Sequence, residues 1–230
     1  MSERGETDQI YTYESDFQNY SIAFRSRKDN KFMMAVGSYN TNSMNNVVDI
    51  IDLKFKKPND GFTKVNQFQH EFPPTKIMWI PDTEGQKKDI LATTAEYLRI
   101  WELQEDTNQY KEHKILKNIN TDFCHPITSF DWNSKSLNMI GTCSIDTTCT
   151  IWDIEKQCVS TQLIAHDSAV YDINFRDEQM FASSGEDGSV RHFDLRDLEH
   201  STIIYESNNK NPLLRVAWNK INKYYLATVE

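Results

Sequence analysis

A self-similar unit returns along the chain at near-constant spacing and ends in an aromatic-acidic pair. Residues 141–153 align without a gap with residues 182–194, so that Trp152-Asp153 matches Phe193-Asp194, 41 positions later. Trp101-Glu102 lies 51 positions before Trp152-Asp153. A period of roughly 40–45 residues with such an ending is typical of β-propeller blades, which have four strands each.

The repeat predicts an all-β propeller with about four blades and the first two strands of a fifth. The blade units lie at 20–70, 75–117, 126–165, 169–206 and, in part, 213–230. Residues 1–8 have the composition of a flexible N-terminus, and residues 9–14 are expected to form a strand that closes a ring. Because natural sheets seldom leave an edge unpaired, we expect a fragment of a longer ring, about 300 residues at seven blades. Polar insertions, such as the one at 81–89, lengthen the early loops, where partner-specific surface is often added.

Composition limits the classes of function. The 230 residues are 38% hydrophobic, which suffices for a core, and their net charge of −9 argues against sequence-independent nucleic-acid binding and against anionic membranes. No apolar stretch has the length of a signal peptide or a membrane span. The four cysteines (Cys124, Cys143, Cys149 and Cys158) contain no Cys-x-x-Cys pair, so we expect small buried thiols, not a metal site or disulfides. No cofactor or metal is expected.

Two blades carry the same polar side chains at the same offsets from their aromatic residue. These are His125, Thr142 and Asp146 before Trp152, and His166, Ser183 and Asp187 before Phe193. The set resembles the Ser-His-Asp constellation of a hydrolase. An active site is needed once, whereas this set recurs, so a buried hydrogen-bond relay that ties the strands of one blade is the favoured interpretation.

The first two blades lack a complete relay. Ala95-Glu96 replaces the turn acid in the second, and Ile51 stands in place of the indole in the first, so weaker ties are expected there. The histidines outside the relay are expected to occupy solvated or rim positions; these are His70, His113, His192 and His200.

Several segments go beyond a generic propeller. They include YLRIWEL (97–103), SIDTTCTIWDIEK (144–156), TQLIAHDSAVYDI (161–173) and GSVRHFDLRDLEHSTIIYES (188–207). In these segments the chain resembles the WD-repeat family that holds the plant anthocyanin and trichome regulators of the transparent-testa-glabra type. The same family includes their animal counterpart, which scaffolds dual-specificity tyrosine-regulated kinases.

The resemblance implies a non-enzymatic adaptor, in the cytoplasm and nucleus, that assembles protein kinases or transcription factors of the MYB or basic helix-loop-helix type. A second implication is a substrate receptor of a cullin-RING ubiquitin ligase, because propellers that dock on the ligase adaptor often end a blade in Trp-Asp-x-Arg. Phe193-Asp194-Leu195-Arg196 matches that pattern with Phe for Trp, which makes Asp194 and Arg196 candidates. The alternative is that Asp194 closes its strand and Arg196 is a solvated charge. A hydrolase using Ser183, His166 and Asp187 is the most distant hypothesis.

Overall fold

The computed structural model describes residues 10–42, 44–55, 61–104, 106–117 and 125–230. It holds four antiparallel sheets of four strands and one sheet of two strands, and the strands of each sheet follow in chain order. The first sheet has β1 (Asn19–Phe24), β2 (Phe32–Ser38), β3 (Asn46–Leu53) and β4 (Phe62–His70). The second has β5 (Lys76–Trp79), β6 (Ile90–Thr94), β7 (Leu98–Gln104) and β8 (Gln109–Leu116).

The last two complete sheets belong to the repeats from which the fold was predicted. The third has β9 (Ile127–Trp132), β10 (Met139–Ser144), β11 (Thr148–Asp153) and β12 (Cys158–Ile164). The fourth has β13 (Val170–Phe175), β14 (Met180–Gly185), β15 (Ser189–Asp194) and β16 (Asp197–Glu206). The two-stranded sheet pairs β17 (Arg215–Trp218) with β18 (Leu226–Val229). The predicted all-β blade architecture is confirmed, and below we call the sheets blades 1 to 5.

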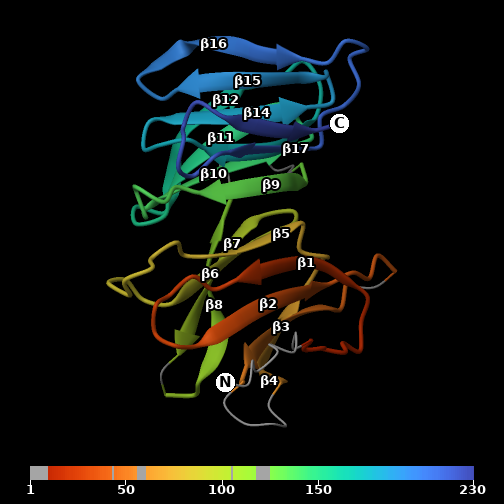
Figure 1. Cartoon of the computed structure of the whole chain (residues 1–230), viewed down its shortest axis with the longest axis vertical. Coiled ribbons are helices and arrows are strands. Elements are labelled where there is room, and N and C mark those ends of the chain that lie inside the picture. The colour runs from red at the N-terminus through yellow and green to blue at the C-terminus, as the bar shows by residue number, and fades with distance from the viewer. Residues whose placement is uncertain (1–9, 43, 56–60, 105, 118–124) are drawn as a thin grey trace, which may run out of the picture.

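The first strands of successive blades lie next to one another: β1 beside β5, β5 beside β9, β9 beside β13, and β13 beside β17. The last strands lie at the outside, and β4 and β16 mark the two ends of the view in Figure 1. A radial arrangement of this kind buries the inner strands on both faces, as β10 and β14 show. By contrast, every residue of β16 is exposed.

The apolar cores lie between blades, not within them. Trp79, Trp101 and Tyr110 of blade 2 pack with Phe68 of blade 1 in one buried cluster. Each of the other clusters also takes its members from two neighbouring blades. Burial of apolar area stabilises by roughly 25 cal/mol per Å², so these shared clusters hold the blades together.

The expected ring-closing strand differs from the structure. Residue 9 lies outside the described residues, as do residues 1–8, and residues 10–14 form no strand. A strand needs a neighbour to complete its backbone hydrogen bonds. This segment is held through a side chain instead, because the Tyr13 hydroxyl donates to Asp49 Oδ2 at 2.8 Å.

The turn between β10 and β11 contains Thr147 with a φ of 75°, at the position that Gly188 occupies with a φ of 76° in blade 4. A β-branched residue is strained there. We expect Thr147→Gly to raise the free energy of unfolding by about 1 kcal/mol in urea titrations. Thr147→Ala keeps a Cβ and should give less than half of that gain; an equal gain would contradict backbone strain as the cause.

Candidate functional site

The structure brings His166, Ser183 and Asp187 together in blade 4. The Ser183 hydroxyl donates to His166 Nε2 at 2.7 Å, and His166 Nδ1 lies 3.0 Å from both oxygens of Asp187. Ser189 Oγ also donates to Asp187 Oδ1 at 2.7 Å. Burial lowers the pKa of His166 although Asp187 acts in the opposite sense. Burial by itself would raise the pKa of Asp187, but hydrogen bonds from Ser189 and His166 lower it to about 2. The cluster therefore holds a neutral imidazole on an ionised carboxylate.

These contacts have the connectivity of a hydrolytic triad but not its accessibility. Ser183 is 0% exposed and His166 is 1% exposed. A nucleophile must reach the substrate atom that it attacks, and Ser183 Oγ is closed off by the blade. The geometry therefore ties β14 to the loop before β13 and to the β14–β15 turn.

The second blade contains a relay that the sequence offsets did not reveal. Trp101 Nε1 donates to Thr93 Oγ1 at 2.8 Å, and Thr93 Oγ1 lies 3.0 Å from His70 Nε2. The other ring nitrogen of His70 binds the Phe72 carbonyl oxygen, so Nδ1 is the donor and Nε2 the acceptor. His70 is 2% exposed, and its predicted solvated or rim position is wrong. The acid of this turn, Glu96, pairs with Arg99 instead.

The third blade forms only part of its expected relay. Trp152 Nε1 donates to Thr142 Oγ1 at 2.8 Å, and the Thr142 hydroxyl donates onward to the Thr150 carbonyl oxygen at 3.4 Å. Asp146 Oδ1 accepts from the hydroxyl of Thr148 at 2.6 Å. His125 is exposed, unlike His70 and His166.

Strand register explains why the indole and the hydroxyl meet. Thr142 pairs with Thr150, and Thr93 pairs with Arg99; in both blades the tryptophan lies two residues beyond that partner. Residues two apart on a strand share a face, so the indole crosses diagonally to the hydroxyl. Ser183 pairs with Arg191 in the same register, but the residue two beyond is Phe193, which has no N–H to donate.

Buried neutral histidines predict an acid-sensitive fold. Burial lowers the pKa of His70 to about 4, below the ordinary value of about 6.5. Because the folded-state pKa is depressed, the stabilisation is complete above pH 6.5 and is lost as the pH falls toward 4. We expect the free energy of unfolding to be about 2 kcal/mol lower at pH 5 than at pH 7.5. Urea titrations at both values measure it.

The control for this pH effect is the exposed His200. His200→Asn should keep the difference between the two pH values, whereas His70→Asn should reduce it. If His70→Asn leaves the difference between pH 5 and pH 7.5 unchanged, His70 is not the group that makes the fold sensitive to acid.

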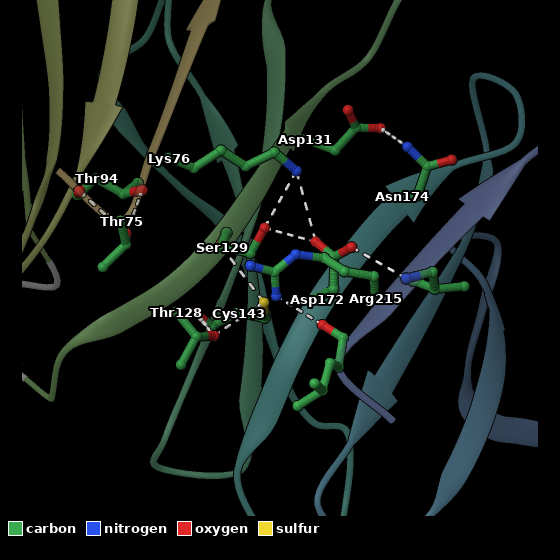
Figure 2. Close-up of polar contacts among 12 residues, drawn as sticks. Thr75, Lys76, Thr94, Thr128, Ser129, Asp131, Cys143, Asp172, Asn174 and Arg215 are labelled. Atoms are coloured by element: carbon green, nitrogen blue, oxygen red, sulfur yellow. Dashed lines mark hydrogen bonds and ion pairs between the residues drawn. The ribbon is translucent and has the colours of Figure 1, made fainter. Parts of the chain in front are cut away.

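A polar cluster lies where the inner strands of four blades converge (Figure 2). Asp172 Oδ1 accepts from the Ser129 hydroxyl at 2.6 Å, and Lys76 Nζ approaches both, at 3.1 Å from Ser129 Oγ and 3.5 Å from Asp172 Oδ1. The other oxygen, Asp172 Oδ2, accepts from the backbone N–H of Val216 at 3.1 Å. One carboxylate thus links β5, β9, β13 and β17. Its charge is compensated by a lysine and by fixed donors, as buried carboxylates require.

Other inner-strand side chains bind the backbone of the following blade. Asp131 Oδ2 accepts from the backbone N–H of Phe175 at 2.8 Å, and Asn174 Oδ1 accepts from that of Trp218 at 2.8 Å. Thr128 Oγ1 donates to the Val170 carbonyl oxygen at 2.6 Å. Burial raises the pKa of Asp131. The partners are 42 to 44 positions apart, so the links repeat with the blade period.

Asp194 and Arg196 form a pair at the turn between β15 and β16. Arg196 Nε donates to Asp194 Oδ1 at 2.8 Å, and Arg196 N donates to the same oxygen at 3.0 Å. The side chain of Arg196 is 62% exposed. The equivalent Asp153 accepts from the backbone N–H of Lys156 at 2.9 Å, so the aspartate closes the turn in both blades. The paired, exposed guanidinium distinguishes blade 4.

The cysteines that the structure describes do not share one environment. Cys143 and Cys149 are buried, as expected, but Cys158 is exposed because it begins the outer strand β12. Cys124 lies outside the described residues. In the described part of the chain, no group of three or more His, Cys, Asp or Glu side chains could hold a metal ion. In that part, no helix is long and apolar enough to cross a membrane.

Comparison with known proteins places this geometry in a family. The model of the WD domain, G-beta repeat, matches residues 116–153 and 156–194. The DDB1- and CUL4-associated factor 7 homolog of Dictyostelium discoideum is 48% identical over 226 residues, which cover 98% of this chain and 69% of that protein. The chain belongs to the WD-repeat family. The matched residues contain all of blade 3 and the first three strands of blade 4, the two blades whose repeat predicted the fold.

This WD-repeat protein is also similar to fungal relatives. An uncharacterised WD repeat-containing protein of Schizosaccharomyces pombe is 40% identical over 188 residues, covering 76% of this chain and 42% of that protein. A WD repeat-containing protein of Saccharomyces cerevisiae is 44% identical over 155 residues, covering 59% and 29%. The chain thus spans less than half of either fungal relative.

Proposed function

We propose that this WD-repeat protein is a non-enzymatic scaffold that assembles other proteins, with protein kinases or transcription regulators as partners. One observation carries the proposal: the only constellation with catalytic connectivity found in the described residues, His166-Ser183-Asp187, is buried and serves to tie a blade. The buried polar side chains described above hold strands and blades together. What remains for function is the surface, which is the part of a WD-repeat protein that binds partners.

Affinity capture of the intact protein with identification of bound proteins tests the scaffold. We expect a protein kinase, or a transcription factor of the MYB or basic helix-loop-helix type, to be retained and to elute with the protein as a defined complex. Ser183→Ala should retain the same partners if the variant folds. Turnover of an ester or peptide substrate that disappears in Ser183→Ala would overturn the proposal. We also propose residence in both cytoplasm and nucleus, which imaging of the tagged protein would test.

A second candidate is a substrate receptor of a cullin-RING ligase. Two observations favour it: a relative at 48% identity is named for association with DDB1 and CUL4, and Arg196 holds an exposed guanidinium beside Asp194 at a blade end. Replacing Asp194 and Arg196 together with alanine is expected to weaken capture of DDB1 by at least about tenfold, because paired arginines are frequent anchors of interfaces.

The matched control is the same double change in blade 3, Asp153→Ala with Lys156→Ala. It removes an aspartate–cation pair from the equivalent turn. Capture of DDB1 should survive there, and so should kinase capture in both variants. Equal loss of DDB1 in the two variants would indicate a general effect on the blades and would dismiss the motif.

A further inference from the structure

An apolar cavity of about 290 Å³ opens between blades 2 and 3. Its apolar walls come from both blades and comprise Ile80, Ile90, Ile100, Leu116, Leu137 and Ile154. Three of these, Ile90, Leu137 and Ile154, are only partly buried, although they pack against the core shared by the two blades. Cavities of roughly 300 Å³ are at the lower end of those that hold ligands, a size that suits one large apolar side chain.

The rim of this cavity is basic. Lys88 pairs with Glu102, which also lies 3.4 Å from His113 Nδ1, and Asn138 Nδ2 donates to Glu155. Both rim carboxylates are therefore engaged.

The ammonium groups of Lys87 and Lys114, by contrast, have no partner among the residues that the structure describes. Three lysines face two glutamates on this rim, in a chain whose net charge is −9. Two free cations beside an apolar pocket complement an apolar side chain that has carboxylates next to it.

We propose that this cavity binds a short acidic segment of a partner protein, which inserts one leucine or phenylalanine between blades 2 and 3. Lys87 and Lys114 then bind carboxylates that flank the anchor. Lys87 lies in the loop between β5 and β6, and Lys114 lies on β8, so the two cations approach the segment from different elements. The inference rests on the proposed scaffold function and gives one of its partners a stated chemistry.

A fluorescently labelled acidic peptide with one central leucine is the probe, titrated into the intact protein and followed by anisotropy. We expect saturable binding that weakens by at least about tenfold when the peptide's leucine becomes alanine, because the pocket loses its apolar contact. Lys87→Glu with Lys114→Glu should weaken binding by a similar factor. Lys87 is exposed and Lys114 is partly exposed, and circular dichroism checks that this variant folds.

The control variant is Lys54→Glu with Lys220→Glu, which makes the same change of charge at two exposed lysines, one after β3 and one after β17, outside the cavity. Its affinity should stay within about twofold of the unchanged protein, since exposed charges at a distance are screened by salt. Equal weakening by both double variants would overturn the proposal, as would absence of saturable binding. Tighter binding of a fatty-acid probe than of the peptide would also overturn it. Kinase or transcription-factor capture that persists in such a case leaves the scaffold function standing.

Discussion

Replacing Asp187 with alanine is expected to lower the free energy of unfolding by about 3 kcal/mol, because it removes a carboxylate that accepts several hydrogen bonds and leaves a buried N–H without its acceptor. The change leaves His166 Nδ1, which is buried, without its carboxylate. It also removes an acceptor from Ser189 and from Arg191, whose Nη2 lies 3.1 Å from Asp187 Oδ2. Urea titration at pH 7.5 measures the loss.

The matched control is Asp146→Ala, which changes the equivalent residue of blade 3. Asp146 Oδ1 accepts from the hydroxyl and the backbone N–H of Thr148, at 2.6 Å and 3.0 Å, within its own turn. We expect a loss of about 1 kcal/mol, the worth of a typical local hydrogen bond. Equal losses in the two variants would contradict a role for the buried imidazole.

Asp172→Ala is expected to destabilise the protein by about 3 kcal/mol, because it strands buried donors on two other blades. The Ser129 hydroxyl and the Val216 N–H both lose their acceptor, and Lys76 loses its nearest carboxylate. Figure 2 shows the side chains of Ser129 and Lys76 converging on Asp172. Urea or thermal unfolding measures the loss, and its midpoint should fall.

Asp172→Asn is the conservative comparison. It keeps an oxygen that can accept from Val216 N but removes the charge that Lys76 faces. We expect less than half of the loss seen with alanine. If asparagine and alanine cost the same, the charge, and not the acceptor for the neighbouring blade, would be what matters at this position.

The blade architecture could be predicted because the residues that specify it repeat. Trp152-Asp153 and Phe193-Asp194 end units that align without a gap, and each unit folds into a four-stranded sheet. The Trp152–Thr142 pair was predictable for the same reason.

His70 escaped prediction because offsets along the chain depend on turn length. It lies 31 positions before Trp101, whereas His166 lies 27 before Phe193, because the β5–β6 loop (80–89) is longer than the equivalent β13–β14 loop (176–179). Counting from the strand register, and not from the tryptophan, places Thr93 opposite Arg99, two residues before Trp101.

The links around Asp172 could not be predicted, because they join different blades. Whether Ser129, Lys76 and Val216 N meet one carboxylate depends on how far each sheet is rotated from the next. That rotation follows from packing of the shared cores, which involves every large side chain at the contact. The spacings of Ser129 and Val216 from Asp172, 43 and 44 residues, give a partial signal that is visible once the period is known.

Since every buried apolar cluster is filled from two adjacent sheets, a single sheet is not an independent folding unit. Excising an inner sheet would expose apolar surface on both of its faces. A cut between two blades would expose both sides of the apolar cluster that they share. The solubility of a shortened version of this protein should therefore depend on how many of these clusters between blades it keeps complete.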